Sequence, residues 1–221
     1  MTMQNFIIWC RKCDIPLWAC VYFLVAFPAA FLFPPWVGWE NGPLEMVQNI
    51  VLAAGAACCS ALFCKARGPY HHGLWLAASV YFLILLGREL SWGRVFMLKT
   101  MTDHGPVFVS MHSLPHYILI HGIIAVIILM TLLALIVLMP WKEIFLHIPF
   151  PGPAFLILIA ASAFAALGDK GLLTGGPFDE NLEEEMELLV YILHLYFVRW
   201  YYHEMENTID DKNRQKKQNR I

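Results

Sequence analysis

Long apolar segments separated by short polar ones alternate along this chain. Most of these segments approach or exceed the roughly 20 residues that an α-helix needs to cross the hydrocarbon core of a bilayer. The pattern therefore predicts an all-α bundle of about six membrane-spanning helices. The expected spans cover about residues 15–36, 44–64, 74–96, 115–139, 153–167 and 186–202. The last two are short, so five spans, or a re-entrant segment at one of these positions, is the alternative.

The composition agrees with a membrane protein. Hydrophobic residues make up 59% of the chain and charged residues only 14%, whereas a soluble domain carries about 25% charged residues. Residues 1–9 have neither a basic region nor a small-residue cleavage site, so we expect the first span to be an anchor rather than a removable signal peptide. Residues 1–204 are expected to form the transmembrane domain.

The distribution of charge orients the expected spans. Basic residues precede the first span, follow the second and fourth, and are concentrated in residues 205–221. By the positive-inside rule, both termini are expected to be cytoplasmic. Residues 205–221 then form a basic, polar cytoplasmic tail, expected to be flexible and to fix topology rather than to bind nucleic acid. The six cysteines fall on the cytoplasmic side, where structural disulfides are disfavoured.

A charged motif closes the third expected span. Arg88 and Glu89 follow an apolar run, and an ionisable residue at such a position is a functional-site hypothesis by default. The alternative is a buried ion pair that only holds two helices together. Ser91 is a weaker candidate, as a nucleophile or an oxyanion donor. No Gly-x-Ser-x-Gly turn surrounds Ser91, and a serine within a helix usually bonds to its own backbone.

Titratable side chains also form a stripe on the sixth expected span. Glu180, Glu184, Glu187, Tyr191 and His194 follow one another at spacings of four, three, four and three residues, which places them on one face of a helix. In lipid this face must turn inward, toward partners or water. His194 alone is as well explained by a structural hydrogen bond to another span.

Histidines near the start of the fourth expected span suggest a metal site. His112, His116 and His121, with His194 and the carboxylate of Asp169, are ligand types that suit zinc or another divalent cation. Pro115 weakens the helical spacing of His112 and His116. The alternative is that these histidines lie at the membrane interface near lipid headgroups.

The expected topology brings many polar residues to the extracytoplasmic face. We expect Glu89 or Glu187 to act as a general base there, with Ser91 as a further catalytic candidate. The residues expected to bind substrate are Arg88, Trp92, Arg94, Glu45 and Tyr191.

The segment from Glu89 to Phe96, with its Glu-Leu-Ser-Trp-Gly sequence, resembles a motif in a group of uncharacterised bacterial multi-pass membrane proteins. In that group a histidine precedes the next helix, matched here by His112, and an acidic segment opens a late span, matched by residues 183–187. Arg94 departs from the group, which commonly has glutamine there. The resemblance implies a bacterial cytoplasmic membrane protein and implies no activity.

A second resemblance is to ceramidase-like seven-span membrane hydrolases, which hold zinc with serine, aspartate and three histidines. It implies roles for Ser91, Asp169 and three of the four histidines His112, His116, His121 and His194. The chain departs from that family in its six expected spans and in lacking a second histidine paired with His194 on the last span.

These features favour a metal-dependent hydrolase or transferase that takes a lipid-like substrate from the membrane. A proton- or ion-coupled transporter, or a transporter subunit, is the alternative. A structural membrane partner without catalysis is the second alternative. No Gly-rich phosphate-binding loop or nucleic-acid motif is present in the sequence.

Overall fold

The computed structural model describes residues 16–65, 69–102, 105–147 and 150–218. Within these ranges the chain is mostly helical. The α-helices are α2 (Leu17–Leu32), α3 (Pro43–Lys65), α4 (Pro69–Glu89), α5 (Tyr117–Leu138), α6 (Trp141–His147), α7 (Gly152–Asp169) and α8 (Pro177–Gln218). Short 3-10 helices lie at Pro35–Val37 (η1), Ser91–Phe96 (η2) and Met111–Ser113 (η3), and two strands, β1 (Leu98–Thr102) and β2 (Gly105–Phe108), form a hairpin.

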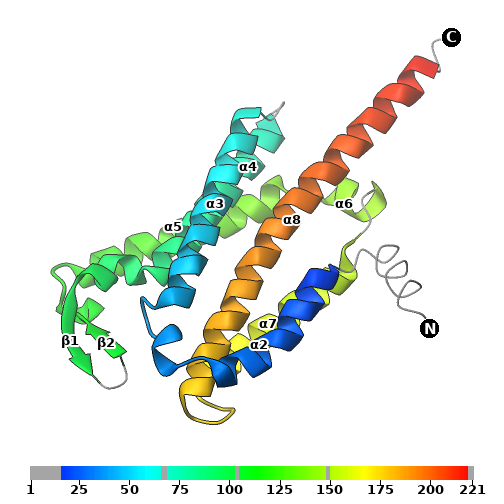
Figure 1. Cartoon of the computed structure of the whole chain (residues 1–221). Helices are drawn as coiled ribbons and strands as arrows, with labels where there is room; N and C mark the ends of the chain where they lie inside the picture. Colours follow the sequence, from blue (N-terminus) through cyan, green and yellow to red (C-terminus); the bar gives the residue numbers. More distant parts are fainter. Residues whose placement is uncertain (1–15, 66–68, 103–104, 148–149, 219–221) are drawn as a thin grey trace, which may run out of the picture.

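Helix α8 is the central element, and the other helices pack on two sides of it (Figure 1). On one side lie α2 and α7, where small residues such as Ala26 and Ala161 meet Leu182, Met186 and Leu189 of α8. On the other side lie α3 and α4, which contribute a second core cluster of Leu52, Ala56, Cys59, Phe82 and, from α8, Tyr191. The polar stripe of α8 therefore lies between two helix pairs.

Helices α3 and α4 form a closely packed antiparallel pair. Gly55 makes their approach possible, because a Cβ atom at this position would lie 2.5 Å from Cδ1 of the buried Phe82 ring. The Ser60 and Ser79 hydroxyls are 2.8 Å apart, and Ser79 Oγ donates to the Ala56 carbonyl at 3.0 Å.

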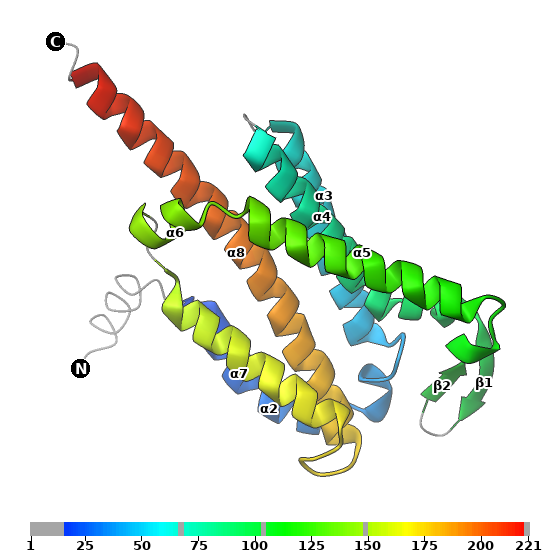
Figure 2. The ribbon, with the colours of Figure 1, turned by 180° about the vertical axis from the view of Figure 1, so that it is seen from behind.

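Helix α5 lies at the periphery and packs on α4. Figure 2 shows the molecule from behind, with α5 in the foreground. Its apolar side chains are mostly exposed, and Thr131 is its buried residue. Among the described residues, α3, α5 and α7 are long and apolar enough to cross a membrane, and α2 is apolar but has only 16 residues. These helices support integration into a membrane, while the full set of six spans stays a prediction.

The third expected span is shorter than predicted. Helix α4 ends at Glu89, and the chain then turns through Ser91, Trp92 and Gly93 at φ values of 44°, 55° and 89°. These left-handed conformations are unfavourable for residues with a Cβ atom, so the continuous helix expected up to Phe96 is wrong. The hairpin that follows, with Thr102 paired to Gly105, makes the described fold mostly helical rather than all-α.

The sixth expected span belongs to a longer helix. Helix α8 begins at Pro177 and continues to Gln218, a length of about 63 Å at 1.5 Å per residue. Most of the segment expected to be a flexible tail is therefore helical. Figure 1 shows the C-terminal part of α8 projecting beyond the other helices.

The Gly55 contact leads to a test of the packing between α3 and α4. The substitution Gly55→Ala must displace the Phe82 ring, and overpacking of this kind costs about 1–3 kcal/mol. Gly122→Ala on α5 is the matched control, because a Cβ atom there meets no neighbouring atom within 4 Å. Thermal unfolding in a mild detergent should show a lower midpoint for Gly55→Ala and an equal or higher midpoint for Gly122→Ala. Equal midpoints for the two variants would contradict the packing described here.

Candidate functional site

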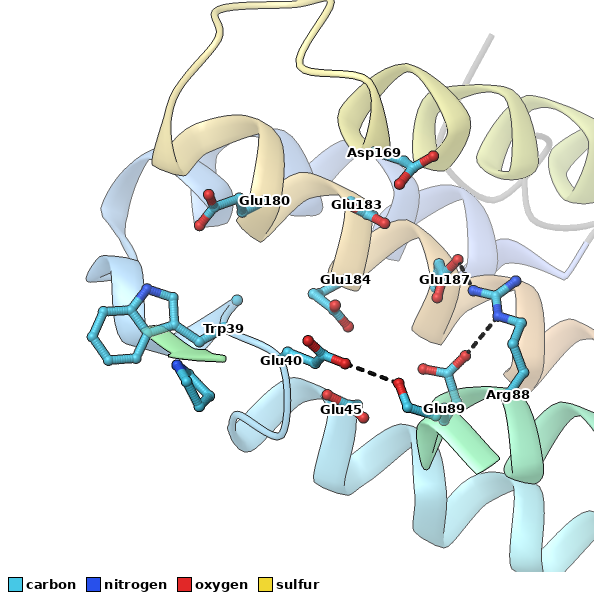
Figure 3. Close-up of a pocket in the computed structure, with 13 residues that line it drawn as sticks. Trp39, Glu40, Glu45, Arg88, Glu89, Asp169, Glu180, Glu183, Glu184 and Glu187 are labelled. Carbon is cyan, nitrogen blue, oxygen red and sulfur yellow. Dashed lines mark hydrogen bonds and ion pairs between the residues drawn. The ribbon is translucent and has the colours of Figure 1, made fainter. Parts of the chain in front are cut away.

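An acidic cavity of about 440 Å³ lies where the beginnings of α3 and α8 meet the ends of α4 and α7. Figure 3 shows the side chains that surround it. The lining residues are Gly38, Trp39, Glu40, Glu45, Arg88, Glu89, Ser91, Pro106, Asp169, Glu180, Glu183, Glu184 and Glu187. They include eight carboxylates and a single cationic side chain, Arg88. We call this space the acidic cavity.

The crowding of carboxylates changes their acidity. Burial, followed by the negative charge of Glu187, raises the pKa of Glu183 to about 8 and that of Glu184 to about 9. Both residues precede residue 186, where the sixth expected span begins. Because burial and neighbouring carboxylates disfavour the charged forms of Glu183 and Glu184, this part of the cavity favours the uptake of protons or other cations.

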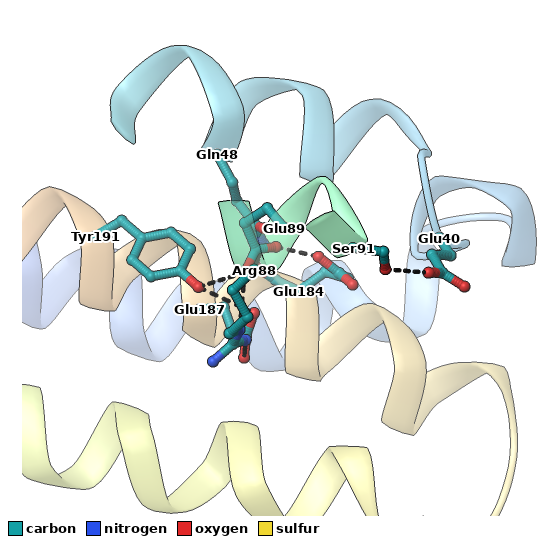
Figure 4. Close-up of polar contacts among 8 residues, drawn as sticks. All are labelled: Glu40, Gln48, Arg88, Glu89, Ser91, Glu184, Glu187 and Tyr191. Carbon is teal, nitrogen blue, oxygen red and sulfur yellow. Dashed lines mark hydrogen bonds and ion pairs between the residues drawn. The ribbon is translucent and has the colours of Figure 1, made fainter. Parts of the chain in front are cut away.

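Arg88 connects the end of α4 to α8. Its Nε atom lies 3.1 Å from Glu89 Oε1, and its terminal nitrogen donates to Glu187 Oε1. The Tyr191 hydroxyl donates to Glu89 Oε1 at 2.6 Å, and Glu187 Oε2 lies 3.4 Å away from it. Figure 4 shows this network of four residues, in which the Glu89 and Tyr191 side chains are buried.

A second set of contacts comes from α3. Gln48 is fully buried, and its Nε2 atom donates to Glu184 Oε2 at 2.7 Å and to the Glu184 carbonyl at 2.9 Å. Glu45 is also buried, at 3% exposed, and its Oε2 atom accepts from the backbone N–H of Asn41. Its other oxygen, Oε1, is buried without a hydrogen-bond partner among the described residues. A buried acceptor of this kind needs a donor or a cation.

Three carboxylates of the cavity lie close enough to share an ion. Oxygen atoms of Glu89, Glu184 and Glu187 all lie within 4.8 Å of one another. Tyr191, Gln48 and the Arg88 guanidinium bond to these carboxylates, as residues around metal ligands commonly do. We call Glu89, Glu184 and Glu187 the carboxylate trio.

Ser91 lies at the rim of the acidic cavity, in the left-handed turn that follows α4. Its hydroxyl donates to Glu40 Oε1 at 2.9 Å. The expectation that Ser91 bonds back to a helix backbone is therefore wrong, since the helix ends before it. Arg94 bonds through Nε to the Ser91 carbonyl at 3.1 Å and through a terminal nitrogen to the Val109 carbonyl at 3.4 Å, which ties the turn to the hairpin.

Two residues expected to bind substrate do not line the acidic cavity. Arg94 contacts the backbone, as described above. The Trp92 ring lies over Gly87, where a Cβ atom would come within 2.8 Å of Trp92 Cζ3. The other three, Arg88, Glu45 and Tyr191, lie at the acidic cavity or in its hydrogen-bond network.

The histidines expected to bind a metal are divided between two places. His112, His116 and His121 are exposed and lie around the start of α5, next to the hairpin in Figure 2 and away from α8. The His112 and His121 ring centroids are 6.2 Å apart, and His121 Nδ1 donates to the Tyr117 carbonyl at 3.0 Å. His116 has left-handed backbone, with φ at 59°. None of the three lines the acidic cavity.

His194 lies on α8 beyond Tyr191 and does not line the acidic cavity. Its Nδ1 atom donates to the Val190 carbonyl at 2.8 Å, and its Nε2 atom accepts from the Tyr81 hydroxyl at 3.0 Å. Both ring nitrogens of His194 therefore make hydrogen bonds within the bundle, which agrees with a structural role for this histidine. Asp169 lies at the acidic cavity with the carboxylates of α8. The structure therefore places Asp169 with the carboxylates but does not bring it together with the three histidines of the α5 start.

Asp179 fixes the loop between α7 and α8, which connects Asp169 to Glu180, two residues that line the acidic cavity. Its carboxylate accepts hydrogen bonds from the backbone N–H groups of Leu173, Thr174 and Gly175 and from the Thr174 hydroxyl, at 2.7 to 3.1 Å. Burial acts to raise the pKa of Asp179, but these hydrogen bonds outweigh it and hold the pKa below its usual value. The loop between α7 and α8 is thereby held against the first turn of α8.

The structure adds to the site four residues that were not among the predicted site residues: Glu40, Gln48, Glu183 and Glu184. Glu184 belonged to the predicted stripe, and Gln48 lies three residues after Glu45 on α3, so helical spacing placed both on the correct face. Glu40 lies in a loop after η1, where no periodicity indicates a direction. Its proximity to Ser91 depends on the tertiary fold.

Comparisons of this chain with protein-family models, curated proteins and solved structures found no match. The site is therefore interpreted from its own geometry.

The buried pair Tyr191 and Glu89 allows a direct test of the network. Tyr191→Phe removes one donor to a buried carboxylate, which costs about 1–3 kcal/mol in unfolding free energy. In the Glu89→Gln background the same substitution should cost less, because the acceptor is no longer charged. A double-mutant cycle measured by denaturant unfolding in detergent checks this. Strictly additive effects would show that the hydroxyl does not depend on the Glu89 charge.

Asp179 predicts a pH dependence of stability. A carboxylate with a lowered folded-state pKa stabilises the fold above its unfolded pKa, and this contribution disappears as pH falls through the folded value. The difference in melting temperature between wild type and Asp179→Ala should therefore be full at pH 6 and shrink below about pH 4, the usual range for aspartate. Thermal unfolding between pH 6 and pH 3 measures it. A constant difference over this range would contradict the assignment.

Proposed function

We propose that this protein is a membrane-embedded, divalent-cation-dependent hydrolase or transferase that acts on a lipid-like substrate at the acidic cavity. The observation that carries the proposal is the carboxylate trio, whose oxygens converge in the cavity that buried Glu45, with its unpartnered Oε1, also lines. Bringing several carboxylates together at the membrane interface is unfavourable in free energy, because like charges repel and lose solvent, unless the set binds a cation.

The chemistry of the donors favours a hard cation. Carboxylate oxygens are the preferred ligands of Mg²⁺, Mn²⁺ and Ca²⁺, whereas zinc favours histidine and cysteine. The histidines at the α5 start lie apart from the trio, so we propose Mg²⁺ or Mn²⁺ rather than the zinc that the histidines suggested.

The surrounding residues have defined parts in this proposal. Gln48 and Tyr191 orient Glu184 and Glu89 by donating hydrogen bonds to them. Arg88 offsets part of the negative charge that remains at Glu187. A bound cation of this type polarises a substrate oxygen and lowers the pKa of coordinated water. Glu45 then accepts the proton of the attacking water through its unpartnered oxygen, and the proton passes to the leaving group.

Ion-coupled transport is the second candidate, favoured by the extension of polar groups from the acidic cavity to Tyr81 and His194. Beyond His194, however, α8 presents Val198 and Tyr201 to a cavity lined almost entirely by apolar side chains. The described residues beyond His194 do not continue the polar path, and an enzyme accounts better for a polar site that ends at His194.

Cation binding is tested on chelator-treated protein. Mn²⁺ bound per chain is measured by titration with electron paramagnetic resonance, and we expect one high-affinity ion. Gln48→Leu, which removes a partner of one ligand, should weaken binding by about 10- to 100-fold, and Glu187→Gln by at least as much. Glu180→Gln is the matched control, since Glu180 is exposed and outside the trio. Equal affinity for Glu187→Gln and Glu180→Gln would overturn the proposed cation site.

Catalysis is tested separately. The protein is incubated with a bacterial lipid extract with and without Mn²⁺, and products are followed by mass spectrometry. We expect cation-dependent conversion of a lipid by the wild type, and its loss in Glu45→Gln while Mn²⁺ is still bound. Conversion that is unaffected by Glu45→Gln would exclude Glu45 as the proton acceptor.

A further inference from the structure

Two more cavities continue from the acidic cavity along α8. The second has a volume of about 570 Å³ and lies between α4, α7 and α8. It shares Arg88, Asp169, Glu183 and Glu187 with the acidic cavity, so the two spaces adjoin. Small side chains of α7 face the second cavity, including the exposed Ala166. They leave room beside α8 for a ligand.

The third cavity, of about 550 Å³, adjoins the second at Tyr81 and His194. Its wall is almost entirely apolar, with Phe82, Leu158 and Phe197 among its residues, and it includes the aromatic side chains Trp75 and Tyr201. A site that is acidic at one end and apolar at the other matches a molecule with a polar head and a hydrocarbon chain.

The dimensions fit one extended chain. From Glu184 to Tyr201, α8 rises about 26 Å at 1.5 Å per residue, which is most of the ~30 Å hydrocarbon core of a bilayer. The membrane supplies chains of this kind directly, because α5 and α7 leave exposed apolar surfaces next to these cavities.

The charge of the acidic cavity selects the head. When all eight carboxylates are ionised, one divalent cation at the trio together with Arg88 offsets three of their eight negative charges. Asp169, Glu180 and Glu183 lie outside the trio and face the same space. A phosphate head would be repelled by this excess of negative charge, whereas an ammonium group would be attracted to it.

We propose that the three cavities form a single site for a membrane amphiphile with an amine-bearing head at Asp169, Glu180 and Glu183 and one long apolar chain that reaches Trp75 and Tyr201. This inference rests on the proposed function, because it takes the acidic cavity as the place where the substrate head is bound. It specifies the substrate class as a cationic, single-chain lipid or the amine-bearing chain of a larger lipid.

The test uses a hexadecylamine that carries a diazirine at the chain end. The full-length protein in detergent is photolabelled and the modified peptides are mapped by mass spectrometry. We expect label on α4 near Trp75 and on α8 near Tyr201. Unlabelled hexadecylamine should compete at least tenfold better than hexadecyl phosphate, and octylamine should compete poorly because its chain is too short to reach the apolar cavity.

Matched variants of α7 locate the chain path. Ala166→Phe fills the second cavity and should reduce labelling by at least tenfold. Ala163→Phe, on the same helix, is the control, because Ala163 is exposed and lines none of the three cavities. Asp169→Asn combined with Glu183→Gln should weaken competition by hexadecylamine while leaving the mapped position of the label unchanged.

The same labelling is repeated after treatment with a chelator, which separates the two proposals. Specific labelling that persists without Mn²⁺ supports the amphiphile site even if the protein binds no cation and converts no lipid. Label distributed over the outer faces of α5 and α7, equal competition by hexadecyl phosphate, or equal labelling of Ala166→Phe and Ala163→Phe would overturn the amphiphile site.

Discussion

The described structure depends on one interaction: the repulsion among the carboxylates on the acidic face of α8, which neighbouring donors must offset. Glu184 and Glu187 lie within one turn of each other, and they meet Glu89 of α4 inside the bundle. Like charges at these separations repel strongly in a medium of low dielectric constant. Arg88, Tyr191 and Gln48 supply the donors that hold these carboxylates in place, so the ends of α3, α4 and α8 are fixed relative to one another.

This constraint explains why the backbone departs from a regular helix at the end of α4. Glu89 must face α8, while Ser91 meets Glu40 from the loop between η1 and α3. The left-handed turn at residues 91–93 separates these two directions and starts the hairpin. Unfavourable backbone of this kind persists where surrounding contacts determine it, and it concentrates at functional sites.

Packing on the other side of α8 complements the polar network. Alanines of α2 and α7 let these helices approach the leucines and Met186 of α8 closely, as small residues do at helix interfaces in membranes. The acidic residues are thus held on one face of a helix whose opposite face is a tight apolar contact. The second cavity lies between α4, α7 and α8 and joins the acidic cavity to the apolar one, which gives the site an acidic end and an apolar end.

The sequence by itself determined that the chain is a helical membrane protein and that Glu184, Glu187, Tyr191 and His194 share one face of a helix. Both follow from local properties, the length of apolar runs and the 3.6-residue period. It also marked Arg88 and Glu89 as exceptional, since charges next to an apolar run need partners. It did not indicate the turn at Ser91, the hairpin, the extent of α8 or the separation of His112, His116 and His121 from His194. Only the tertiary structure decided these, because they depend on which helices pack together, and that choice is made by contacts such as Gly55 with Phe82 and Arg88 with Glu187, which join residues far apart in the chain.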